Sequence, residues 1–144
     1  MSKILIDTNI VIDLLAKREP FYKSAAQLFS LADKQKLELS ISSLTFANTN
    51  YVLSRLKSTQ EAREILRRFR VLIKVLQLND KLIDLALNDT NFKDFENGLQ
   101  YYTAIENEQD IIITRDLKDF KESKIPVMTA DEYLVSIEIK GQRL

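Results

Sequence analysis

Two aspartates follow apolar segments at opposite ends of this chain. Asp7 comes directly after Ile4-Leu5-Ile6, and Asp116 comes shortly after Ile111-Ile112-Ile113. If both segments are buried parallel strands, their carboxyl ends meet at one edge of a sheet, where side chains distant in sequence converge. Carboxylates crowded together repel one another, and Mg²⁺ or Mn²⁺ relieves that repulsion by binding their oxygens. The two segments therefore predict a site for a hard divalent cation.

Further polar residues are expected near this edge. Asp94 and Asn97 are three residues apart in an expected helix and so share one face of it, although Asp94 could instead only cap the helix. Asp119 follows Asp116 by three residues, and both could equally be solvated loop charges. Asn48 lies in an otherwise apolar helix, where it is either a satisfied buried amide or a group that orients a bound water.

Asp7 and Thr114 have simple interpretations as well. Asp7 taken alone could be no more than the N-cap of the helix that follows it. Thr114 could position water or phosphate, but a threonine after a strand more often caps a helix or favours the strand itself. Thr114 stays a candidate because it is close to Asp116.

The chain has no cysteine and no histidine. A disulfide, a zinc–thiolate site, a thiol nucleophile and an imidazole base are all excluded. Any catalysis must therefore rest on carboxylates, hydroxyls, Lys, Arg or Tyr. A divalent cation held by carboxylates can promote phosphodiester hydrolysis without histidine.

The charges balance at 21 basic and 21 acidic residues, but they are unevenly distributed. Residues 51–74 hold seven basic residues against two acids, and residues 79–122 hold eleven acids against five bases. Four arginines of the basic segment could follow an RNA backbone: Arg63, Arg67, Arg68 and Arg70. The alternative is a solvated helix face on which these arginines pair with Glu61 and Glu64.

Strand and helix patterns alternate along the chain. Strands are expected at 3–6, 37–41, 71–76, 111–113 and 126–128, and helices at 10–15, 21–34, 46–56, 59–69, 80–87 and 94–107. This alternation predicts a parallel sheet with helices on both faces, and the length suits a single domain over residues 1–144. No signal peptide and no apolar segment near 18 residues is found, so we expect a soluble, cytoplasmic protein.

Three motifs resemble the PIN domain family, the fold of VapC-type toxin ribonucleases. They are Ile6-Asp7-Thr8-Asn9, Asp94-Phe95-Glu96-Asn97-Gly98-Leu99-Gln100 and Thr114-Arg115-Asp116-Leu117-Lys118-Asp119-Phe120. The motifs occur in the family's order, and the resemblance extends from Asp7 to Thr129. It implies a three-layer α/β/α domain with a central parallel sheet of four or five strands. It also implies an endoribonuclease whose acids hold Mg²⁺ or Mn²⁺ and activate water.

The resemblance assigns roles to particular acids. Asp7 matches the family's first catalytic acid and Asp116 its fourth. Asp94 takes the third role in place of Asn97, and Asp119 matches an auxiliary position, so Asp7, Asp94, Asp116 and Asp119 are the expected metal ligands. The chain departs from the family at Asn48, where many relatives carry glutamate. It departs again at Asn97, where relatives commonly carry aspartate, and a neutral amide binds a hard cation less strongly than a carboxylate.

Three functions compete at this point. The leading one is the toxin half of a toxin–antitoxin pair, which the resemblance implies would bind RNA, a small antitoxin protein and a second copy of itself. The main rival is a catalytically weakened PIN scaffold that binds RNA or protein without cleaving. A third is an acid-cluster phosphatase or phosphotransfer domain, although the second aspartate expected two residues after Asp7 is Asn9 here.

Overall fold

A single parallel sheet forms the centre of the protein. The computed structural model describes residues 1–143, with side chains as far as residue 138. The sheet is made of β1 (Ser2–Ile6), β2 (Leu37–Ser42), β3 (Lys74–Leu76), β4 (Ile111–Ile113) and β5 (Val127–Met128). The strand order is β3-β2-β1-β4-β5, and every neighbouring pair is parallel. The predicted parallel sheet of four or five strands is confirmed.

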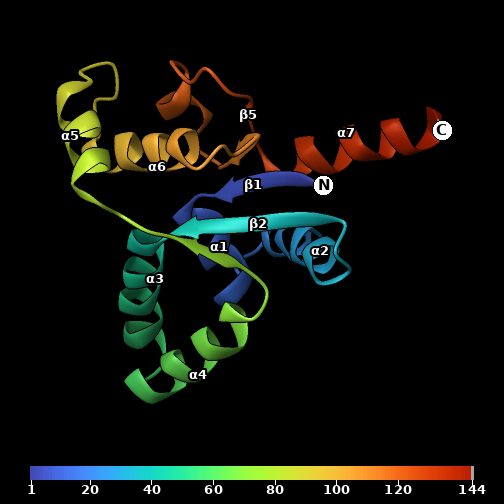
Figure 1. Ribbon diagram of the computed structural model, residues 1–144. Coiled ribbons are helices and arrows are strands. Elements are labelled where there is room, and N and C mark those ends of the chain that lie inside the picture. The colour runs from blue at the N-terminus through green and yellow to red at the C-terminus, as the bar shows by residue number, and fades with distance from the viewer. Residues whose placement is uncertain (144) are drawn as a thin grey trace.

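Helices cover both faces of this sheet and make the expected three layers (Figure 1). One layer contains α5 (Asp80–Asn88), α6 (Phe95–Glu106) and the short 3₁₀ helix η1 (Leu117–Phe120). The opposite layer contains α1 (Thr8–Leu15), α2 (Tyr22–Asp33), α3 (Ser43–Leu56), α4 (Thr59–Arg70) and α7 (Ala130–Arg143). Among the described residues, no helix combines the length and the apolar character needed to cross a bilayer.

The apolar sequence of β1 explains why both faces are covered. Side chains alternate along a strand, so Ile4 and Ile6 pack into the cluster beneath α1, α2 and α3, while Leu5 packs into the cluster on the α6 side. All three side chains are fully buried. A strand buried on both faces reads as a continuous apolar segment, as this one does.

Polar residues end the strands and begin the helices at one edge of the sheet. Asp7 is the N-cap of α1, and Ser42 is the N-cap of α3, where its Oγ accepts from the Thr45 backbone N at 3.2 Å. The N-termini of α1 and α3 therefore lie at the carboxyl edge of the sheet. Helix N-termini carry partial positive charge, which favours negative groups at this edge.

Two elements differ from the sequence expectation. The third strand was expected over 71–76 but covers Lys74–Leu76, because α4 continues to Arg70 and a turn follows it, in which the Leu72 backbone N donates to the Phe69 carbonyl at 3.0 Å. Helix α7 was not expected at all. Its start carries a capping box, in which the backbone N and Oγ1 of Thr129 bond reciprocally with the side chain and backbone N of Glu132.

Candidate functional site

The carboxylate of Asp7 is the fixed centre of the polar residues at the carboxyl edge. Its side chain lies at the end of β1 and is only 7% exposed. Oδ1 accepts from the Thr8 backbone N at 2.8 Å and from Gln100 Nε2 at 3.3 Å, and Oδ2 accepts from Thr114 Oγ1 at 2.8 Å. Because both oxygens are held, the carboxylate has one orientation, as a binding site for a cation requires.

Asp116 is joined to Asp7 through Thr114 and Asn9. The Asn9 amide donates to Asp116 Oδ2 at 3.1 Å and to Thr114 Oγ1 at 3.4 Å. The Asp116 backbone N donates to Thr114 Oγ1 at 3.0 Å, and the same oxygen donates to Asp7. The strand ends themselves are tied together because the Asp7 backbone N donates to the Ile113 carbonyl at 2.9 Å. The expected meeting of the two strand ends is confirmed.

Burial makes the negative charge of Asp7 costly. It raises the pKa of the Asp7 carboxyl above its ordinary value of 3.8, and the negative charge of Asp116 raises that pKa further. Hydrogen bonds from Thr114, Thr8 and Gln100 oppose the shift without cancelling it. A bound cation would favour the ionised form, so this pair of acids has a physical reason to bind one.

This raised pKa predicts a pH dependence of stability. The stabilisation that Asp7 contributes in its neutral form is fully present below the unfolded pKa of 3.8 and is lost as pH rises through the raised folded pKa. The unfolding free energy of the wild type should therefore fall relative to that of Asp7→Asn over this window. Urea unfolding of both proteins in EDTA, from about pH 4 to about pH 8, measures the difference. A difference that stays constant with pH would contradict the prediction.

A second group of polar residues lies at the start of α6. Asp94 is the N-cap of α6, and its Oδ1 accepts from the Glu96 backbone N at 2.8 Å. Glu96 Oε1 in turn accepts from the Asn48 amide at 2.7 Å. Partial burial raises the pKa of Glu96, and the charges of Asp94 and Asp7 raise it further, against the Asn48 hydrogen bond. Asn48 thus donates to an acid whose pKa is also raised by the charge of Asp7.

The four expected metal ligands are only partly brought together. Asp7 and Asp116 share the network described above, whereas Asp119 is an exposed residue of η1 whose backbone N donates to the Asp116 carbonyl at 3.0 Å. Over the part of the chain that the structure describes, no three acids form a group that could enclose a metal ion. Asn97 is half-buried in the first turns of α6.

An oxygen-only pair still fits a hard cation. Mg²⁺ commonly takes one or two carboxylates and completes its coordination with waters and substrate phosphates. Asp7 and Asp116 offer such a pair, and their mutual repulsion contributes to the raised pKa of Asp7. The donor set contains no sulfur and no imidazole, which favours Mg²⁺ or Mn²⁺ over softer metals.

Three contributors were missed at the level of sequence: Asn9, Glu96 and Gln100. Gln100 is 1% exposed, and its Nε2 donates to Thr45 Oγ1 at 2.9 Å as well as to Asp7. Its Oε1 accepts from no group that the structure describes. The sequence did contain one indication of its role: the Gln100 side chain lies between Leu99 and Tyr101, on the part of α6 that must be buried.

The four arginines are divided between two hollows. Arg63, Arg67 and Arg70 line a groove beside Phe46, and Arg68 instead lines a hollow beside Leu14. All four arginines are exposed. In the part of the chain that the structure describes, no ion pair joins these arginines to Glu61 or Glu64. The alternative of a solvated helix face held by such ion pairs therefore lacks the pairs it expects. Their contact with RNA stays a prediction.

Comparison with known proteins agrees with this geometry. The family model described as PIN domain matches residues 3–118. The chain is 28% identical over 135 residues to ribonuclease VapC1 of Aquifex aeolicus, which covers 92% of this chain and 93% of the relative.

Solved structures show the same fold. VapBC2 of Rickettsia felis, bound to a DNA fragment from their promoter, superposes with a TM-score of 0.67 at 20% identity, covering 88% of this chain and 96% of the other. VapBC-1 of nontypeable Haemophilus influenzae superposes with a TM-score of 0.69 at 16% sequence identity, covering 90% of this chain and 98% of the other.

Proposed function

The chain belongs to the PIN domain family, and from that premise we propose that it is a metal-dependent endoribonuclease, the toxin of a toxin–antitoxin pair. The observation that carries the proposal is the link between Asp7 and Asp116, which Thr114 and Asn9 make across the ends of β1 and β4. Similarity to a ribonuclease over nearly the full length of both chains supports the activity.

The catalytic acids proposed are Asp7, Asp94 and Asp116. Asp7 and Asp116 would hold Mg²⁺ or Mn²⁺, with Asp94 and Asp119 as further ligands. When bound, such a cation lowers the pKa of its water and stabilises negative charge on a phosphodiester. Thr114 and Gln100 keep the Asp7 carboxylate in one orientation, and the burial of Asp7 limits its contact with bulk water.

The proposed partners follow from the chemistry and from the structural neighbours. RNA is the substrate, with the arginines of α4 as its electrostatic contacts. Several solved structures that share this fold are complexes described as VapBC or as toxin–antitoxin, which supports a small antitoxin as partner. We propose a homodimer acting in the cytoplasm.

The rival is a scaffold that no longer cleaves. It is favoured by the two neutral amides, Asn48 and Asn97, and by the lack of a three-acid group among the described residues. Metal affinity separates the two functions, because a scaffold that only binds RNA or protein needs no cation.

The test is a calorimetric titration of metal-free protein with Mn²⁺, followed by incubation with RNA in Mn²⁺ or in EDTA. Saturable binding together with cleavage that EDTA abolishes is the expected result. Absence of saturable Mn²⁺ binding would overturn the metal-dependent activity and leave the scaffold.

Restoring an acid at Asn97 should strengthen the site. Asn97→Asp adds a carboxylate beside Asp94 and Glu96, and a hard cation binds a carboxylate more tightly than an amide. We expect the calorimetric dissociation constant for Mn²⁺ to fall by about tenfold, which corresponds to about 1.4 kcal/mol. Asn91→Asp adds the same charge in the loop before α6 and serves as the control. Equal affinities in the two variants would contradict the prediction.

A further inference from the structure

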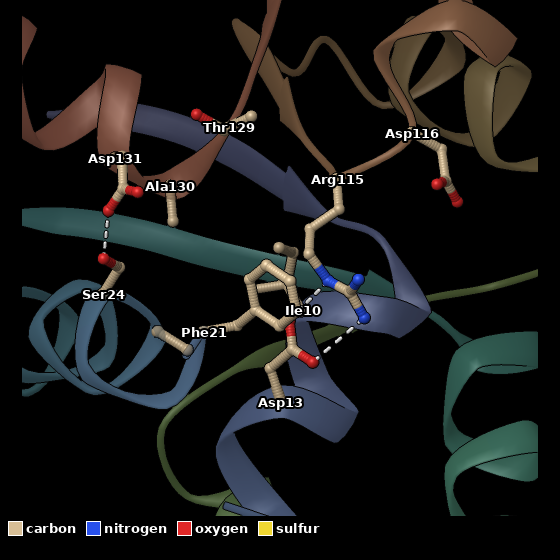
Figure 2. Close-up of a pocket in the computed structure, with 10 residues that line it drawn as sticks. Ile10, Asp13, Phe21, Ser24, Arg115, Asp116, Thr129, Ala130 and Asp131 are labelled. Atoms are coloured by element: carbon tan, nitrogen blue, oxygen red, sulfur yellow. Dashed lines mark hydrogen bonds and ion pairs between the residues drawn. The ribbon is translucent and has the colours of Figure 1, made fainter. Parts of the chain in front are cut away.

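A cavity opens beside Asp116, which forms an acidic pair with Asp7, and this cavity has no role in the function proposed so far. We call it the side cavity. It has a volume of about 280 Å³ and lies between the starts of α1, α2 and α7 and the segment after β4. Its wall includes Ile10, Phe21, Ser24, Arg115, Asp116 and Asp131 (Figure 2). Asp116 is therefore common to the wall of the side cavity and to the acidic pair.

Arg115 forms a rigid part of the wall. Its Nε and Nη2 donate to the two carboxylate oxygens of Asp13 at 2.8 and 3.2 Å, and the Asp13 side chain is fully buried. The guanidinium also lies over the Phe21 ring, with Cζ 4.0 Å from the ring centroid. Asp13 neutralises Arg115, and Phe21 remains 40% exposed, so the wall offers a flat aromatic surface and a planar guanidinium already fixed in place.

Acceptor oxygens lie at the other end of the side cavity. Ser24 Oγ donates to Asp131 Oδ1, as Figure 2 shows. One hydroxyl cannot satisfy a carboxylate, which has two oxygens and about four lone-pair sites. No ion pair joins Asp131 to a cation in the described part of the chain. A ligand that enters here meets a hydrogen-bond acceptor at its far edge.

We propose that the side cavity binds one base of the RNA strand, next to the phosphate held at the acidic pair, and that it prefers guanine. This inference rests on the proposed ribonuclease function. Bases of single-stranded RNA are held by stacking on aromatic rings or guanidinium planes and by hydrogen bonds to their edges. A cavity just under the 300–1,000 Å³ typical of drug-sized ligands suits a small flat group.

The preference for guanine follows from the carboxylate. The Watson–Crick edge of guanine presents two adjacent donors, N1–H and the N2 amino group, which match the two oxygens of Asp131. Adenine and cytosine present one amino group beside an acceptor nitrogen, and that acceptor would face a carboxylate oxygen. An arginine side chain of a peptide is the alternative ligand, because a guanidinium also pairs with a carboxylate through two parallel hydrogen bonds.

The probes are guanosine, inosine and adenosine 5′-monophosphates, titrated in Mg²⁺ into ¹⁵N-labelled protein. None contains an internucleotide bond, so binding is measured whether or not the protein cleaves RNA. We expect the guanine nucleotide to shift the amide signals of Ser24, Ala25 and Asp131 and to bind about tenfold tighter than the adenine nucleotide. The inosine nucleotide, which lacks the N2 amino group, should lie between them.

Asp131→Asn should reduce this preference to less than about twofold, because an asparagine side chain offers only one acceptor oxygen. Glu138→Gln removes an exposed charge two turns further along α7 and should leave the preference unchanged. Equal binding of the three nucleotides, a preference that survives Asp131→Asn, or no shift up to about 10 mM nucleotide would overturn the proposal.

A tripeptide Ala-Arg-Ala tests the other class of ligand. Saturable shifts of Asp131 by the peptide, without shifts by any nucleotide, would also overturn the base site. Nucleotide binding as expected in a protein that cleaves no RNA would instead leave the base site standing and remove the proposed nuclease. RNA cleavage by a protein that binds the three nucleotides equally would overturn the base site and leave the proposed nuclease standing.

Discussion

Asp7→Asn is expected to abolish saturable Mn²⁺ binding and to lower RNA cleavage by more than about 100-fold. Loss of a residue that merely supports a metal ligand commonly costs 10- to 100-fold, and Asp7 is proposed as a ligand itself. The substitution removes one of the two charges at the strand ends. It also places an amide donor where Thr114 or Gln100 now donates. Calorimetry and an RNA cleavage assay, run on the same preparations, measure both effects.

The control for this variant is Asp33→Asn, which removes an equal charge from an exposed position at the end of α2. It should leave Mn²⁺ binding and cleavage unchanged. Misfolding is not expected to explain a loss in Asp7→Asn, because removing a costly buried charge should not lower stability near neutral pH. Retained Mn²⁺ binding by Asp7→Asn would show that the acidic pair is not the metal site.

The sheet could be predicted because its strands are buried on both faces. Apolar segments such as Ile4-Leu5-Ile6 and Ile111-Ile112-Ile113 leave no other interpretation once helical patterns alternate with them. The place of Asp7 and Asp116 followed, because residues after parallel strands share an edge. Val71 shows the limit of this reasoning. It is β-branched and apolar, but it caps α4 and is 84% exposed.

The rest of the site was hidden because it depends on contacts between distant segments. Gln100 reaches Asp7 across 93 positions of sequence, and Asn48 reaches Glu96 across 48. Nothing local to either residue indicates its partner. Asp94 is the opposite case, because its role as a helix cap was visible locally and is confirmed.

Arg115→Met is expected to lower the free energy of unfolding by about 3 kcal/mol. The substitution keeps much of the side-chain length over Phe21 but leaves the fully buried Asp13 without its two hydrogen bonds. Removing one partner of a buried ion pair commonly costs 3–5 kcal/mol, and Arg115 is 29% exposed, so the lower end applies. Urea unfolding monitored by far-UV circular dichroism gives the difference.

The double variant Asp13→Leu/Arg115→Met separates a lost charge pair from lost packing. An apolar pair of similar size needs no counter-charge, and such replacements are often neutral or stabilising. We expect it to recover most of the stability that Arg115→Met loses. Arg18→Met, at an exposed position after α1, should change stability by less than about 0.5 kcal/mol. If the double variant were no more stable than Arg115→Met, the stability lost in Arg115→Met would not come from the unpaired charge of Asp13.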